Sequence, residues 1–152
     1  MSEIYSLSPD DWLGILFRLS IALLAGAVIG LEREIKSKPA GLATHMLVSF
    51  ASALFTLLPI LTGDAIKSSD ALARVIQGIA AGVGFLGAGV ILQESQPPSN
   101  GKKIRGLTSA AAIWVSSALG IAAACGLWQL SLVATGLTLV VLRVFKTLEN
   151  HL

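Results

Sequence analysis

Residues 107–142 read LTSAAAIWVSSALGIAAACGLWQLSLVATGLTLVVL, 36 residues without one charged side chain. A single helix of that length would reach about 54 Å, whereas the hydrocarbon core of a bilayer is about 30 Å thick. The stretch is therefore expected to fold back on itself. The best place is Ala124-Cys125-Gly126-Leu127, because glycine breaks a helix and Trp128 can lie at the membrane interface. Two spans, 107–124 and 127–142, are predicted, and the second has the weaker signal.

The rest of the chain repeats this pattern. Apolar residues make up 54% of the 152 residues and charged ones 13%, about half of what a soluble domain carries. Further apolar runs at 13–31, 42–61 and 71–92 are each long enough to cross a bilayer. The first run is expected to stay as a span. A signal peptide begins with a positively charged region, whereas no Lys or Arg precedes Arg18 here. The sequence predicts one all-α domain over 1–152, a polytopic membrane helical bundle of five transmembrane helices.

The basic residues give the expected orientation. With the N-terminus outside, the inner segments hold eight of the eleven Lys and Arg residues. These are Arg33, Lys36, Lys38, Lys102, Lys103, Arg105, Arg143 and Lys146. The outer segments hold only Lys67, beside Asp64 and Asp70. This positive-inside bias predicts N-out and C-in, and it favours five spans over four, which would leave the basic tail outside.

Small residues recur at helix-packing spacing. In lipid, helices associate through close approach of such residues rather than through hydrophobic burial. The glycines expected to make these contacts are Gly26, Gly30, Gly78, Gly82, Gly84, Gly87 and Gly89. The alternative is that some of them line a cavity or interrupt a helix for ion or substrate contact. Residues 82–87 also match the Gly-x-Gly-x-x-Gly fingerprint, but they lie mid-span with no acidic residue about 20 positions on, which argues against nucleotide binding. No nucleic-acid partner is expected.

Three polar residues lie inside predicted spans near the outer side: Arg18, Arg74 and Gln77. The arginines can extend to the interface, where Asp10, Asp11, Asp64 and Asp70 are candidate partners. In the alternative, Arg18 faces the bundle and binds backbone carbonyls or an anionic group.

A second polar group is expected at the cytoplasmic face. It comprises Glu32, Arg33, Glu34, Thr44, His45, Arg105 and Thr108. The positive-inside bias explains why basic residues lie at this face, but it does not explain the presence of the glutamates or the histidine. Glu32 at a helix C-terminus opposes the helix dipole, unless it turns to the N-terminus of the second span or to Arg105. Glu32 and Glu34 are weak candidates for a Mg²⁺ site, since residues two apart point to different helix faces. No cofactor and no enzymatic activity are expected, since no nucleophile–base–acid spacing stands out.

Several motifs in the same order resemble the MgtC/SapB family of bacterial inner-membrane proteins. They are Arg18, GLERE at 30–34, KPAGLATH at 38–45, GFLGAGVI at 84–91, GLTSAA at 106–111 and Trp114. The resemblance implies a five-span inner-membrane domain, with members linked to growth and virulence under magnesium limitation and some to inhibition of the F-type ATP synthase. Two features differ. Ala43 stands where the family commonly has arginine, and the chain ends at Leu152, so we expect a short member without the C-terminal soluble domain.

Two functions follow from these observations. The first is a non-enzymatic regulator that acts in adaptation to magnesium limitation by binding another membrane complex, such as the ATP synthase membrane subunits, within the lipid bilayer. The second is a transporter or channel for magnesium or another ion, against which stands the lack of acidic residues inside the spans. Self-association is a further option. We expect Glu32→Ala and His45→Ala to impair function more than changes at Lys36 or Lys67.

Overall fold

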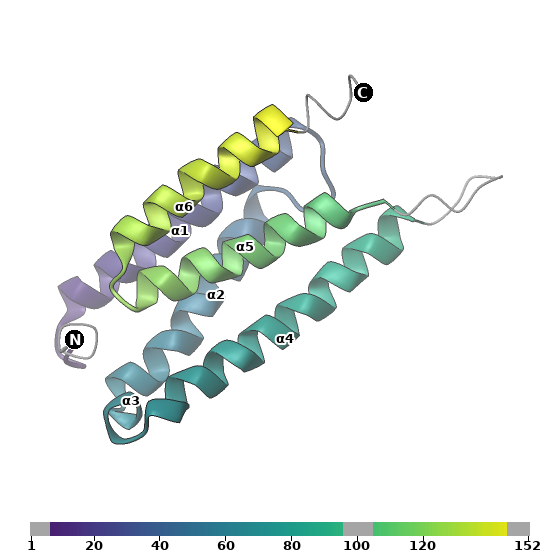
Figure 1. The fold of residues 1–152 in the computed structure, drawn as a ribbon. Coiled ribbons are helices and arrows are strands. Elements are labelled where there is room, and N and C mark those ends of the chain that lie inside the picture. The colour runs from purple at the N-terminus through teal and green to yellow at the C-terminus, as the bar shows by residue number, and fades with distance from the viewer. Residues whose placement is uncertain (1–6, 96–104, 146–152) are drawn as a thin grey trace.

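The computed structural model describes residues 7–95 and 105–145, and all the regular structure in them is helical (Figure 1). The elements are α1 (Trp12–Ile35), α2 (Leu42–Leu61), α3 (Asp64–Lys67), α4 (Ser69–Glu94), α5 (Leu107–Ala124), α6 (Trp128–Val140) and the π-helical segment Val141–Phe145. Within these ranges α1, α2, α4 and α5 are long and apolar enough to cross a membrane, and the apolar helix Trp128–Val144 is shorter. The predicted all-α membrane bundle is confirmed.

Local chemistry explains where the helices begin and end. Helices α2 and α5 have the bounds expected from hydropathy, whereas α1 and α4 extend a few residues beyond theirs. The side chain of Asp11 caps α1 by accepting the N–H of Gly14 at 2.9 Å. The chain reverses between α5 and α6 at Gly126, whose φ of +78° is left-handed backbone that favours glycine. The fold-back at residues 124–127 therefore lies where the sequence indicated it.

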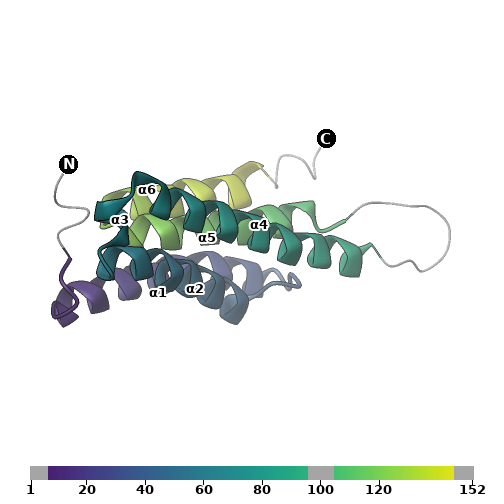
Figure 2. The same cartoon turned by 90° about the horizontal axis from the view of Figure 1, so that it is seen from below.

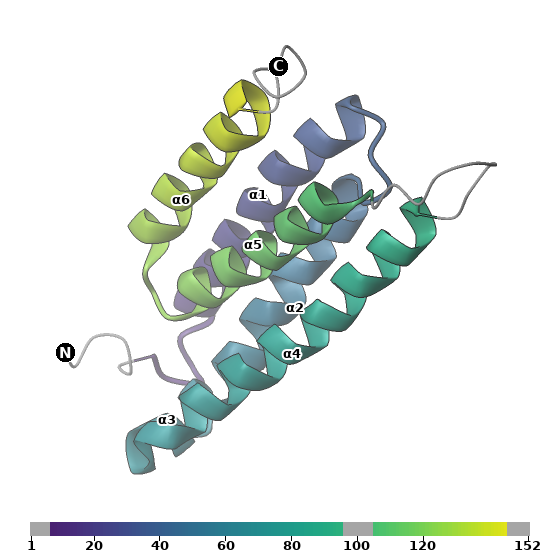
Figure 3. The same ribbon diagram turned by 45° about the vertical axis from the view of Figure 1, so that its right-hand side comes forward.

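The long helices form two staggered layers. Helices α6, α5 and α4 lie side by side in one layer and α1 and α2 in the other (Figures 1 and 2). Helix α5 is central and contacts α1, α2, α4 and α6. Figure 3 shows α4 and α6 on opposite sides of α5. Among the described elements α4 touches only α2, α3 and α5, so much of its surface faces outward.

The described charges separate by end. The loop between α1 and α2 lies at one end of the bundle, and α3 lies at the other (Figure 1). Arg33, Lys36 and Lys38 belong to the first end, and Lys67 of α3 to the second. Lys102, Lys103 and Lys146 lie outside the described residues. The N-out, C-in orientation stays a prediction from this distribution of charge.

The backbones of helices α1, α2 and α5 come nearly into contact where the helices pack. A Cβ atom on Gly26 would lie 2.6 Å from the carbonyl oxygen of His45, and one on Gly30 would lie 2.7 Å from Cα of Leu42. A Cβ atom on Gly120 of α5 would overlap the carbonyl oxygen of Ser49 on α2. Small residues thus let these three helices approach one another closely, as expected in a bilayer.

Hydroxyl groups join the same helices in the interior. Ser49 Oγ donates to the Ala22 carbonyl of α1 at 2.7 Å, and the hydroxyls of Ser52 and Ser117 lie 2.8 Å apart between α2 and α5. Ser131 Oγ of α6 donates to the Leu119 carbonyl of α5 at 3.1 Å. Interhelical hydrogen bonds of this kind supplement van der Waals packing where there is little hydrophobic drive for association.

Most glycines of α4 do not make, with the residues that the structure describes, the helix-packing contacts that their spacing predicts. Gly87 meets Ala110 of α5, with 3.3 Å between their Cβ positions. A Cβ atom on four other α4 glycines, namely Gly78, Gly82, Gly84 and Gly89, would meet no described atom within 4 Å. These four glycines therefore make no close packing contact within the described part of the chain, and their role in helix packing stays a prediction. Regular spacing of small residues identifies a face suited to a neighbouring helix but not whether the same chain provides it.

Candidate functional site

A buried ion pair lies near the end of α1. The side chain of Arg33 is 0% exposed and that of Glu32 is 2% exposed. Arg33 Nε donates to Glu32 Oε2 at 2.5 Å, and Nζ of the partly exposed Lys36 lies 3.1 Å from Glu32 Oε1. Glu32 therefore has two cationic partners, one inside the bundle and one toward its surface.

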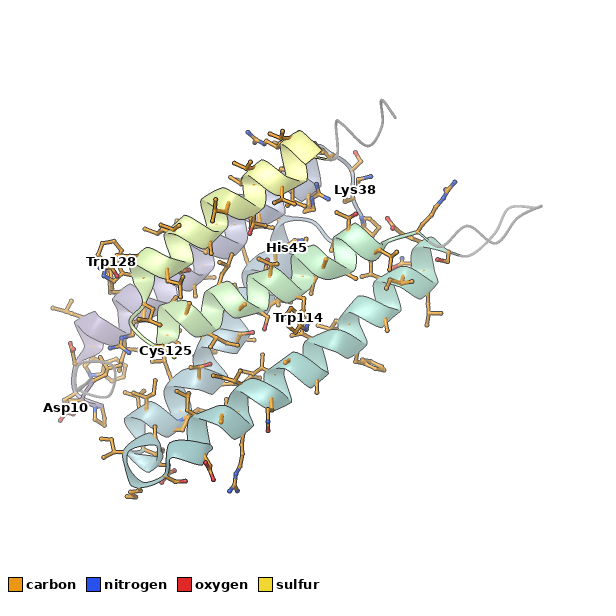
Figure 4. All side chains as sticks on the ribbon, in the orientation of Figure 1. Asp10, Lys38, His45, Trp114, Cys125 and Trp128 are labelled. Carbon is orange, nitrogen blue, oxygen red and sulfur yellow. The ribbon has the colours of Figure 1, made fainter. Side chains whose placement is uncertain are left out.

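His45 extends this group into α2 and α5. Its side chain is fully buried, and Nδ1 lies 2.8 Å from Ser116 Oγ on α5. The close approach at Gly26 and Gly30 brings the His45 backbone against α1, so α1, α2 and α5 together position the ring. Figure 4 shows His45 among these helices, with Lys38 farther out at the same end. We call Glu32, Arg33, His45 and Ser116 the buried polar cluster.

Several hydrogen-bonding atoms of the buried polar cluster are left without a partner in the described part of the chain. Both terminal nitrogens of Arg33 and Nε2 of His45 are buried and have no hydrogen-bond partner among the described residues. A guanidinium group can only donate hydrogen bonds, so Arg33 suits an oxygen acceptor such as a carbonyl, a water molecule or an oxyanion. A cation would meet repulsion from Arg33 there. The cluster is chemically suited to fixing helix positions and to binding an acceptor, and unsuited to coordinating a metal ion.

Glu34 has a different role from Glu32. Its Oε2 accepts the backbone N–H of Leu42 at 2.9 Å, so it caps the N-terminus of α2 from across the loop. Gly41 fits this arrangement, since a Cβ atom there would overlap the Glu34 carboxylate. It is therefore Glu34, and not Glu32, whose carboxylate meets the start of the second span.

The two glutamates do not converge. The carboxylate of Glu32 is held by Arg33 and Lys36, while that of Glu34 faces the start of α2. The described residues contain no group of three or more His, Cys, Asp or Glu placed to hold a metal ion. The donor set consequently does not fit a Mg²⁺ site shared by Glu32 and Glu34.

Three expected members stay apart from the buried polar cluster. The side chains of Thr44, Arg105 and Thr108 make no hydrogen bond or ion pair with the described residues. Arg105 takes part through its backbone, whose N–H donates to Ser95 Oγ at 3.2 Å. Sequence reasoning missed Ser116 as the partner of His45. The spacing of Ser116 within a face of small residues predicted helix packing. Its hydrogen bond to a residue of another helix could be seen only in the three-dimensional structure.

The outer polar residues divide into one that faces the bundle and two that do not. Arg18 donates to the Ala124 carbonyl at the end of α5 at 2.6 Å, which corresponds to the bundle-facing alternative. Arg74 is exposed and its nearest acidic oxygen belongs to Asp70, at 3.9 Å. Gln77 is also exposed and hydrogen-bonds to no described residue.

Ser116→Ala is expected to lower the free energy of unfolding by about 1–3 kcal/mol, because it leaves Nδ1 of buried His45 without a partner. Thr138→Ala is a control, since that hydroxyl bonds only to Ala134 of its own helix. Equilibrium unfolding in mixed micelles would measure both variants. An equal loss in the two would contradict a specific role for the His45–Ser116 contact.

Comparison with known proteins gives one family. The MgtC family model matches residues 19–151. The protein SrpB of Synechococcus elongatus is 50% identical over 148 residues, covering 95% of this chain and 81% of SrpB. YhiD of Escherichia coli (strain K12), named as a candidate magnesium transporter, is 38% identical over 90% of this chain and 63% of its own length. Protein MgtC of Salmonella typhimurium (strain LT2) is 38% identical over 79% of this chain and 47% of its own length.

This chain thus spans only about half to two thirds of YhiD and MgtC. No solved structure matches it.

Proposed function

The chain belongs to the MgtC family of multi-pass inner-membrane proteins, and from this we propose that it is a non-enzymatic regulator of another membrane complex. The complex we favour is the F-type ATP synthase, with regulation taking place during adaptation to magnesium limitation. The proposal combines what the family resemblance implies with a surface of this chain that suits a foreign helix.

The observation that carries the proposal is a groove between α2 and α4. It has a volume of about 550 Å³ and is lined on α4 by Gly78 and Gly82. On α2 it is lined by apolar side chains such as Leu47 and Phe55, which are 65% and 57% exposed. Its lining contains no charged residue. Glycines at the base of an apolar groove allow a helix to approach closely, so the groove suits side chains of a transmembrane helix laid along it.

The charge distribution supports regulation over ion transport. Cation pathways through membranes generally use carboxylate rings or backbone carbonyls. Among the described residues of the long helices, Glu32 is the one carboxylate buried in the bundle, and two cations hold it already. Helix α4 is continuous from Ser69 to Glu94, so its glycines present no unwound carbonyls.

Transport is the second candidate, and one observation favours it. YhiD is named as a candidate magnesium transporter and aligns with 90% of this chain. If the chain shares that activity, Glu32 and Arg18 are the side chains to test, because both lie inside helices and carry charge.

Gly82→Leu tests the groove. Because a Cβ atom on Gly82 would meet nothing within 4 Å, the variant is expected to fold normally while its side chain fills the groove. Recovery of ATP synthase membrane subunits with the tagged full chain is expected to fall about tenfold or more, as overpacking an interface does. Gly136→Leu on α6, where the space is also open, is the matched control and should leave recovery unchanged.

Flux measurements separate the two functions. The purified full chain in liposomes is expected to show no saturable Mg²⁺ flux. Saturable flux that disappears in Glu32→Ala or Arg18→Ala would overturn the regulator proposal in favour of transport. Unchanged recovery of the synthase subunits with Gly82→Leu would remove the groove from the proposal.

A further inference from the structure

Gln77 is an amide in the part of α4 that is expected to cross the hydrocarbon core. It lies eight residues after the start of α4, about 12 Å along the helix, and α4 itself is about 39 Å long. With the hydrocarbon core about 30 Å thick, Gln77 lies within it. Its side chain points away from the bundle and hydrogen-bonds to no described residue. An amide surrounded by acyl chains lacks partners as completely as one buried in a dry core, and this is costly.

The surface around Gln77 is flat enough for another helix. Ala81, Gly84 and Ala88 follow Gln77 at i+4, i+7 and i+11, so the four residues share one face of α4. All four are exposed, and a Cβ atom on Gly84 would meet nothing within 4 Å. We call these four residues the Gln77 face. It differs from the α2–α4 groove, whose lining on α4 includes Val75, Gly78 and Gly82 but no residue of this face.

A second copy of the chain meets the requirements of this face. Copies inserted in the same orientation can be related by a two-fold axis along the membrane normal, the commonest symmetry of homo-oligomers. Such an axis places the two α4 helices parallel, with residues of the same number at the same depth. An amide carries both donors and an acceptor, so Gln77 can bond its own counterpart, whereas a lysine or aspartate would repel its copy.

The charges above Gln77 agree with this pairing. Asp70 and Arg74 lie about two turns and one turn, respectively, closer to the helix start than Gln77, on nearly the same side of α4. Their side chains are 71% and 77% exposed and only 3.9 Å separates the nearest charged atoms, a long and weak pair. Across a two-fold axis, Asp70 of each copy can pair with Arg74 of the other, which gives two reciprocal ion pairs.

We propose that the chain forms a two-fold dimer through the Gln77 face of α4, with the two Gln77 amides hydrogen-bonded across the axis inside the bilayer. This goes beyond the proposed regulation and does not depend on it, because the dimer leaves the α2–α4 groove open for another helix.

Cysteine cross-linking in native membranes tests the dimer. Cys125 is the chain's only cysteine, so Cys125→Ala gives a cysteine-free background. In that background, Gln77→Cys and Ala81→Cys are expected to form a cross-linked species of twice the mass under mild oxidation. Gly136→Cys on α6, which is equally open, is expected not to do so.

Two further substitutions separate the dimer from the groove. In the Ala81→Cys background, Gly84→Leu is expected to abolish cross-linking and Gly82→Leu to leave it intact. In detergent, Gln77→Leu should raise the dimer dissociation constant about 3- to 20-fold, and Gln77→Asn should restore part of the affinity.

Three results would overturn the dimer. One is absence of a cross-linked species at Gln77 and Ala81 together with a monomeric mass by light scattering. Another is equal cross-linking at Gly136, which would reflect random collision. The third is a cross-linked product of another mass, which would assign the Gln77 face to a different membrane protein. None of these depends on whether the synthase subunits are recovered, so the dimer and the proposed function fail separately.

Discussion

Gly120→Val is expected to prevent α2 and α5 from packing together. A Cβ atom at this position would overlap the carbonyl oxygen of Ser49, which belongs to a backbone and cannot rotate away. The helices must then separate, which also pulls apart the Ser52–Ser117 and His45–Ser116 contacts across the same interface. The free energy of unfolding should fall by about 3 kcal/mol or more, the upper range for overpacked cores.

The matched control is Gly136→Val on α6, where a Cβ atom would meet nothing within 4 Å. Both variants replace a helical glycine by the same β-branched residue, so differences in helix propensity cancel. Equilibrium unfolding of the full chain in mixed micelles gives the comparison. If Gly136→Val loses as much stability as Gly120→Val, then the cost lies in replacing glycine and not in the contact with Ser49.

Glu32→Ala is expected to be the most damaging charge substitution in the described residues. It leaves the guanidinium of Arg33 fully buried with no carboxylate beside it, since that side chain has no other hydrogen-bond partner among the described residues. Removing one member of a buried ion pair typically costs about 3–5 kcal/mol. The stability of the folded chain should fall by that amount, and recovery of any membrane partner should fall with it.

A double substitution distinguishes the pair from its individual charges. Glu32→Leu combined with Arg33→Met should lose less stability than Glu32→Ala alone, because no unpaired charge stays inside the bundle. Lys67→Ala serves as the control, since its contact with Asp64 is 3.6 Å long and both side chains are exposed. That pair contributes about 0–1 kcal/mol. Additive losses at Glu32 and Arg33 would contradict a coupled pair.

Hydropathy and charge were enough to predict the helices, because in a bilayer nearly every apolar run of sufficient length becomes one. The reversal at Gly126 followed from the same reasoning, since the uncharged stretch was too long for a single crossing. Hydropathy and charge did not predict which helices pack against one another. Gly26, Gly120 and Gly82 have the same spacing signal, yet the first two contact α2 and the third faces an open groove.

The polar residues were predictable as a group but not in their pairings. Glu32 and Glu34 looked alike in sequence, whereas one is buried against Arg33 and the other caps α2 across the loop. That difference depends on which face of α1 is turned toward the bundle. The packing of Ile29 and its neighbours fixes this rotation of the helix. Arg105 was expected to join them and stays outside, since it lies beyond the N-terminal end of α5.

The contact between Arg18 and the Ala124 carbonyl also bears on how the protein is made. The two residues are 106 positions apart, so the first helix enters the membrane long before its acceptor has been synthesised. During that interval the guanidinium must stay near lipid headgroups or the insertion machinery. When the α5–α6 turn arrives, Arg18 can bind it beside Gly126. The contact thereby joins α1 to the end of α5 only after four of the long helices have been made, so it forms late in the assembly of the described bundle.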